Sequence, residues 1–334
     1  PDLRFNHHET AEFVHKFFGM ALNPDQVAIL DQRTEGWVTG LQLTAMGIKG
    51  QPNITDFIEQ LSGDNRIIGD YLFDEVIANQ PEPVQHFLVV TSAFSRFSSS
   101  MCNAVLGIED SREIIDQLEQ ANLFIIPLDK VRTWYRYHHL FAELLQNRLQ
   151  QYPPENAAAY YLSAAHWFEA HHSLSEAIDY ALSSRDYAYA AQLLQPAIPK
   201  MVSEGAHDRA IRRMKAIPLD VLRRSGYLWQ YLVLTLLDKG SFQEAHQTLF
   251  QIWPDLDDLN DLSPKERDII RGYKRAFLAS ITIHSAIDAH KSRQFSRLAG
   301  DLLPENELLG HSIAYGHYGS SCLHLGYTDK AIES

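Results

Sequence analysis

The segment Gly240-Ser-Phe-Gln-Glu-Ala245 has a counterpart in Gly326-Tyr-Thr-Asp-Lys-Ala331, with alanine five residues after glycine in both. Gly205 to Ala210 keeps this spacing, and His172-Ser-Leu-Ser-Glu-Ala177 keeps it with histidine in the glycine position. A glycine ends one helix and begins a turn, and a small residue in the next helix lets the two helices pack closely. The pattern predicts helix pairs stacked as a tetratricopeptide-like α-solenoid.

The spacing of these alanines sets the size of the predicted repeat. Ala177, Ala210 and Ala245 lie 33 and 35 residues apart, and the interval of 86 residues to Ala331 leaves room for two longer units. We expect sensor-type repeats over residues 226–334 and a helical arm over residues 151–225.

The first 80 residues predict a small all-helical domain. Residues 8–18 carry phenylalanines on one helical face and end at Gly19. Asn23 is expected to cap a second helix with Pro24 in its first turn. Further helix-like segments follow up to Pro81.

Residues 81–150 predict a winged helix, which is three helices followed by a β-hairpin. The third helix is expected at 111–121, capped by Ser111, with Ile114 and Ile115 on its apolar face. Two β-like runs at 123–126 and 134–137 then precede a last helix at 140–150. The fold class predicted for the whole chain is therefore mainly α, with one short hairpin.

Composition and charge narrow the possible functions. The 334 residues are 45% hydrophobic and contain two cysteines, which predicts several packed domains in a reducing cytoplasm. The sequence contains no run of eighteen apolar residues, so no membrane span is predicted. The net charge is −13, and the predicted third helix of the winged helix is acidic, so we do not expect these residues to bind DNA themselves.

Four ordered blocks resemble the large ATP-binding LuxR-type regulators, the family of the maltose regulon activator. They are Arg33-Thr-Glu-Gly-Trp-Val-Thr-Gly-Leu-Gln-Leu-Thr-Ala45, Asp70-Tyr-Leu-Phe-Asp-Glu-Val76, Leu118-Glu-Gln-Ala-Asn-Leu-Phe124 and Trp134-Tyr-Arg-Tyr-His-His-Leu-Phe141. The likeness covers residues 1–225, and the remainder resembles a generic repeat. It implies a signal-transduction ATPase with numerous domains (STAND), in which a P-loop domain precedes a helical lid, a winged helix, an arm, a repeat sensor and an effector.

The resemblance implies that this chain is the central part of such a regulator, with the P-loop domain before it and a DNA-binding effector after it. No Gly-x-x-x-x-Gly-Lys-Ser/Thr occurs in the sequence, so we do not expect these residues to form an enzyme alone. ADP or ATP would be shared with the P-loop domain.

One histidine is singled out by the family likeness. In the STAND class a winged-helix histidine in an apolar-His-x-Leu context contacts the β-phosphate of ADP, and Tyr137-His138-His139-Leu140 matches, which places the role on His138. An imidazole N–H can donate to an anionic oxygen. The alternative is a structural histidine that packs the hairpin. His139 is expected to be an exposed or packing residue.

A second candidate lies at Gly36 and Trp37, where a loop of the class closes over the adenine. The alternative for Trp37 is an ordinary core side chain. We expect no metal, because the sequence has no His-Glu-x-x-His and no cysteine pair. The acidic run at 255–261 is interpreted as a solvated connector rather than a calcium site.

The resemblance implies a switch. ADP would hold a closed monomer, and a small-molecule or protein inducer on the repeats, with ATP exchange, would permit self-association and transcription activation. Tyr231, Tyr273, Tyr315 and Tyr318 could line the inducer surface, although core packing explains them equally well. Two alternatives stay open: a stand-alone repeat scaffold for protein partners, or a STAND protein with a kinase or other effector.

Overall fold

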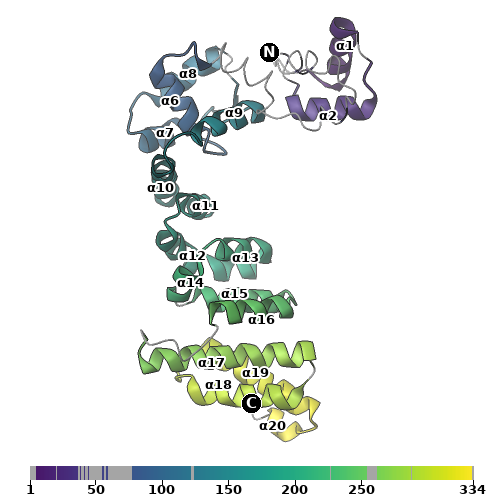
Figure 1. Ribbon diagram of the computed structural model, residues 1–334, viewed down its shortest axis with the longest axis vertical. Coiled ribbons are helices and arrows are strands. Elements are labelled where there is room, and N and C mark those ends of the chain that lie inside the picture. Colours follow the sequence, from purple (N-terminus) through teal and green to yellow (C-terminus); the bar gives the residue numbers. More distant parts are fainter. Residues whose placement is uncertain are drawn as a thin grey trace. The chain divides into compact units, whose positions relative to one another are not determined.

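The computed structural model describes the chain as a series of helices with one short hairpin (Figure 1). The described residues are 5–19, 21–36, 38, 41, 44, 55, 58, 77–121, 124–225, 227–253, 262–286 and 288–332. The expected mainly α fold class is confirmed. None of the described helices is long and apolar enough to cross a membrane.

The chain forms two compact units, Pro1–His172 and Ser173–Ser334. The division lies inside the segment 151–225 that was expected to form the arm. The boundaries expected at residues 80, 150 and 225 remain predictions, and each unit is described below by itself.

The first unit begins with two capped helices, α1 (His7–Phe18) and α2 (Pro24–Thr34). Asn23 caps α2 through a reciprocal bond with Gln26, and α1 ends at Gly19 in the left-handed conformation, both as predicted. Both helices pack on a small core of fully buried side chains: Val14, Leu30, Leu41 and Ile58.

The winged helix follows. Its elements are α6 (Glu82–Thr91), α7 (Ser99–Leu106), α8 (Ser111–Gln120), β1 (Ile125–Pro127), β2 (Tyr135–Tyr137) and α9 (His139–Leu149). The two strands pair antiparallel, with Ile125 opposite Tyr137. Phe97 adds an isolated bridge to Tyr135, and its ring packs against the Tyr137 ring in the core. The order of three helices, hairpin and helix is the predicted one.

The predicted cap of α8 is wrong. The N-cap residue is Asp110, which makes no side-chain cap bond, and Ser111 is the first helical residue with a buried side chain. The Ser111 N–H instead donates to the Asn103 side chain at 3.2 Å, so a residue of α7 caps the helix from outside its own sequence. The predicted apolar face is confirmed, because Ile114 and Ile115 are buried.

Helix α10 (Pro154–Ala170) packs on α7 and on the hairpin. The Trp134 ring at the start of the hairpin stacks on Phe168 with 6.1 Å between centroids and meets the edge of Trp167 at 5.9 Å. Aromatic contacts of this kind hold α10 to the winged helix as one packed body.

The second unit is a series of helices in which successive helices pack on one another (Figure 1). The helices are α11 (Leu174–Ser184), α12 (Tyr187–Ser203), α13 (His207–Lys215), α14 (Leu219–Arg224), α15 (Leu228–Asp238), α16 (Phe242–Ile252), α17 (Pro264–Ile281), α18 (Ala289–Leu302), α19 (Leu308–His324) and α20 (Thr328–Ile332). The acidic run at 255–261 lies outside the described residues.

The glycine turns have the predicted role. Gly205, Gly240 and Gly326 have φ of 77°, 77° and 79°. Each donates its N–H three residues back, and the next residue donates five residues back, which is a Schellman end. His172 occupies the same conformation with φ 59°, as its place in the pattern predicts.

The small residues after these turns are also where close packing needs them. Ala177, Ala210 and Ala245 are fully buried. The 86-residue interval contains two helix pairs, α17 with α18 and α19 with α20, so the expected two longer units are confirmed. Between them, Ala276, Ala299 and Ala314 form a core cluster of small side chains.

We predict opposite effects for two Gly→Ala substitutions in this unit. A Cβ on Gly240 or on Gly316 would meet nothing within 4 Å, so neither change causes a clash. Gly240→Ala should lower stability by about 1 kcal/mol because of its positive φ, whereas Gly316→Ala, inside α19, should raise it by about 1 kcal/mol. Urea denaturation measures both, and shifts of the same sign would contradict the turn assignment.

Candidate functional site: the contact between the end of α2 and the hairpin

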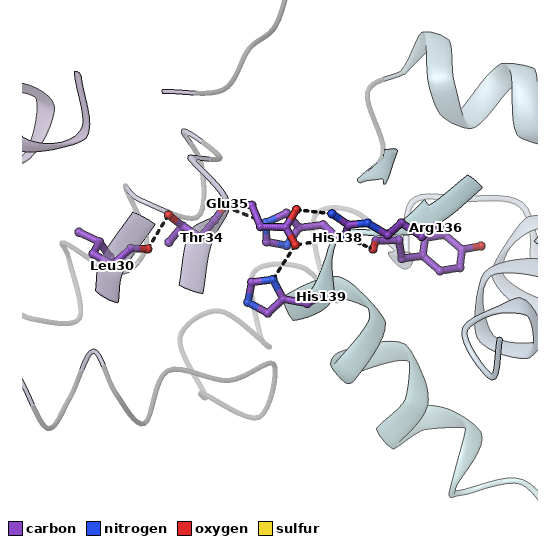
Figure 2. A network of polar contacts seen from close by, with 7 residues as sticks. Leu30, Thr34, Glu35, Arg136, His138 and His139 are labelled. Atoms are coloured by element: carbon purple, nitrogen blue, oxygen red, sulfur yellow. Dashed lines mark hydrogen bonds and ion pairs between the residues drawn. The ribbon is translucent and has the colours of Figure 1, made fainter. Parts of the chain in front are cut away.

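The end of α2 is shaped by two consecutive left-handed residues. Glu35 has φ 48° and Gly36 has φ 69°. The Gly36 carbonyl accepts the N–H of Phe5 at 2.8 Å, and a Cβ on Gly36 would lie 2.2 Å from the Phe5 carbonyl oxygen. Only glycine fits here. The turn leaves the Thr34 carbonyl and the Glu35 side chain facing the winged helix (Figure 2).

His138 lies on the other side of this contact, between β2 and α9. The backbone N–H of His138 donates to the Phe124 carbonyl at 2.7 Å, and only 4% of the residue's surface is exposed. The ring Nε2 lies 2.7 Å from the Thr34 carbonyl oxygen (Figure 2). Because a carbonyl oxygen can only accept, Nε2 carries the proton in this contact. Burial lowers the pKa of His138 to about 4, so the ring is neutral at physiological pH.

Glu35 forms an ion pair with Arg136 of β2. Its two carboxylate oxygens accept from the guanidinium at 3.1 and 2.8 Å, and one of them lies 3.0 Å from Nδ1 of His139 (Figure 2). Burial by itself would raise the pKa of Glu35. The hydrogen bonds from His139 and Arg136 and the nearby positive charges outweigh burial and hold this pKa well below its usual range.

These contacts settle where the sequence-predicted residues lie. His138 and Gly36 come to the same contact, whereas Trp37 lies outside the described residues. The His139 ring packs against that of His138 with 4.7 Å between centroids, one of the two expected roles, and it also bonds to Glu35. Sequence reasoning also missed Glu35 and Arg136 as partners, although both occur inside the family-like blocks that it quoted.

A cavity of about 440 Å³ opens beside this contact. It is lined by Ile29, Gln32, Arg33 and His139. The lining offers a guanidinium, an imidazole and an amide, and the nearby carboxylate of Glu35 is already bonded to Arg136. Such a set of donors fits an anionic group better than a cation.

Glu35, His138 and His139 could also be considered as a metal site. Ligand atoms of Glu35, His138 and His139 lie within 4.8 Å of one another. The Arg136 guanidinium on Glu35 and the Thr34 carbonyl on His138 take up two of the three ligands, so the arrangement is a hydrogen-bonded ion pair.

The third helix of the winged helix is not a basic surface. The guanidinium of Arg112 is 3.0 Å from Asp116, and that of Arg132 is 2.8 Å from Glu119. Acids therefore engage both of these arginines, and the expectation that this unit does not read DNA remains a prediction.

The fold defines a class of protein, in which a winged helix is followed by tetratricopeptide-like repeats. A solved STAND protein with a tetratricopeptide repeat sensor from Pyrococcus horikoshii has a TM-score of 0.51 to this chain, at 13% identity, covering 99% of this chain and 46% of that one. This likeness shows the fold.

Sequence comparison narrows the class further. Residues 73–157 match the family model of the MalT winged helix domain. The HTH-type transcriptional regulator MalT of Vibrio parahaemolyticus is 26% identical over 338 residues, which is 99% of this chain and 36% of the relative. MalT of Yersinia pestis is 26% identical over 306 residues, 90% of this chain and 33% of the relative. This chain is thus similar in sequence to the MalT regulators along nearly its whole length, and similar in fold to one solved STAND protein.

A different kind of relative matches part of the chain. The serine/threonine-protein kinase PknK of Mycobacterium tuberculosis is 30% identical over 193 residues, which is 58% of this chain and 17% of the kinase. The chain thus spans about a third of the MalT proteins and about a sixth of PknK.

We predict that His138 makes stability depend on pH. Between pH 6.5 and about 4 the unfolded chain binds a proton on this ring that the folded chain does not, so stability falls as pH falls. From pH 7 to 5 the loss should be about 2 kcal/mol. His138→Gln keeps an N–H donor but cannot titrate, and it should remove that part of the loss in urea denaturation. His15→Gln, at an exposed position of α1, controls for the substitution, and an equal slope in all three proteins would contradict the prediction.

We predict that Glu35 and Arg136 are energetically coupled. Removing one partner leaves the other charge half-buried, with 20% and 32% of the two side chains exposed. In a cycle of Glu35→Gln, Arg136→Gln and the double variant, the coupling energy should be about 1–3 kcal/mol. Additive losses of stability would contradict it. The exposed i,i+4 pair of Lys200 and Glu204 provides a matched cycle with a coupling near zero.

Proposed function

We propose that this chain is the regulatory middle portion of a STAND-type transcription activator. The contact of Thr34 and Glu35 with the hairpin is the observation that carries the proposal. It joins two segments 104 residues apart through polar bonds. Polar contacts of this kind can open and close reversibly between two global states.

The proposed nucleotide is ADP or ATP, shared with a P-loop domain. In the closed state the N–H of His138 would donate to the β-phosphate, and the Arg33 and His139 side of the cavity would face the phosphates. The same N–H donates to the Thr34 carbonyl in the described contact. Two acceptors thus compete for one donor, which links nucleotide binding to the position of α2. Gly36 would hold the turn in shape for this exchange, and Trp37 would cover the adenine.

The proposed output is self-association and transcription activation through a DNA-binding domain, triggered by an inducer on the repeats. The similarity to MalT along 99% of this chain supports this version. A kinase effector is the second candidate, favoured by the 30% identity to PknK over 193 residues. A stand-alone repeat scaffold has less support, because it gives no role to the contact around His138.

We predict that His138→Ala in the full-length protein raises basal transcription at least about fivefold and lowers ADP retention. The change removes the N–H that holds the closed state. His138→Gln keeps a donor and should stay closer to the wild type. His290→Ala, an exposed histidine of α18, is the matched control. If His138→Ala changes neither basal activity nor ADP retention, the proposed nucleotide role of His138 is contradicted.

A further inference from the structure

A second cavity lies in the repeats, away from the contact just described. It has a volume of about 590 Å³ and is formed by side chains of α18, α19 and α20. The nucleotide role proposed above does not use it, and its lining includes Tyr315 and Tyr318, two of the tyrosines expected to face an inducer. Its walls come from two successive helix pairs, so a ligand there would touch both repeats.

One wall holds a buried hydroxyl with no partner. Ser296 of α18 is 1% exposed, and its Oγ makes no hydrogen bond. By contrast, Ser292, another buried serine of α18, donates to the Ala279 carbonyl at 2.9 Å. A buried unpaired hydroxyl costs free energy that a ligand can recover by bonding to it.

The charges of the lining favour an anion. Arg297 and Lys330 reach the cavity, against one carboxylate, Asp301. The contact between Arg297 and Asp301 is 4.0 Å long and both side chains are exposed, so it holds the guanidinium only weakly. Two cations and a hydroxyl donor match the oxygens of a phosphate or carboxylate group.

Two tyrosines give the cavity an aromatic side. A Cβ on Gly300 would lie 3.6 Å from the Tyr315 ring, so this ring lies close against α18. Tyr315 is 47% exposed, and Tyr318 also lines the cavity. An exposed aromatic ring offers a surface for the body of a small organic molecule.

We infer that this cavity binds a small organic anion, with its phosphate or carboxylate group on Arg297, Lys330 and the Ser296 hydroxyl, and its body against Tyr315. The binding itself does not depend on the nucleotide switch. Its role as the inducer site rests on the proposed function.

Binding is tested on the 334-residue chain by isothermal titration calorimetry with inorganic phosphate, glucose 6-phosphate, citrate and uncharged glucose. We expect saturable binding of glucose 6-phosphate or citrate, with glucose at least tenfold weaker. Arg297→Gln and Ser296→Ala should each weaken binding about tenfold. Lys265→Gln on α17 and Ser312→Ala on α19, both exposed and outside the cavity, are matched controls and should bind like the wild type.

The result identifies the source of the anion. Binding of glucose 6-phosphate alone indicates a phosphate ligand, and binding of citrate alone indicates a carboxylate ligand. Ser296→Ala should leave the thermal midpoint of the free chain unchanged or raised, because it removes an unpaired hydroxyl, and a lowered midpoint would make that hydroxyl structural. Equal binding of glucose and its phosphate, no binding of any probe at millimolar concentration, or affinities unchanged by Arg297→Gln would overturn the site. None of these outcomes touches the His138 experiment, so the two proposals fail separately.

Discussion

The contact between the start of the chain and the winged helix depends on the burial of one carboxylate. Glu35 has only 20% of its side chain exposed, and a carboxylate in such a place must be paired. Its partners, Arg136 and His139, flank His138 in sequence. Once Glu35 is held between them, the preceding carbonyl, that of Thr34, falls on the His138 ring. The ion pair thus sets the geometry of the hydrogen bond beside it.

Much of the fold follows from local signals. Asn23 and Gly19 define helix ends by short-range bonds, and the glycines before each second repeat helix require a positive φ that the sequence reveals directly. His172 fits the same turn without being glycine, which only the spacing to Ala177 indicates. The cap of α8 could not be foreseen, because Asn103 reaches it from another helix across eight residues. Rules based on neighbouring residues therefore do not predict a helix cap when a side chain from another helix accepts the backbone N–H.

In the candidate site, too, single residues could be predicted from the sequence, whereas their partners could not. The family likeness singled out His138 and Gly36, and the structure brings both to one contact, but Glu35, Arg136 and His139 were not expected there. Their pairing spans more than a hundred residues and depends on how the end of α2 meets the hairpin. A sequence pattern identifies residue types within a segment, whereas the choice of partner between segments is a property of the folded chain.

An ion pair also joins successive helix pairs of the repeats. Arg213 of α13 has 6% of its side chain exposed and makes a two-bond pair with Asp179 of α11, each bond 2.7 Å long, together with a bond to the Ser175 hydroxyl. A buried arginine paired in this way fixes one register between successive helix pairs, because any slip leaves its charge unpaired. In the pair of Arg213 the exposed partner is the carboxylate, with 58% of the Asp179 side chain exposed, whereas in the pair of Arg136 it is the guanidinium, with 32% exposed. Under the proposed function the pair of Arg213 stays closed as a joint along the solenoid, and the pair of Arg136 opens, with water replacing its bonds as it parts.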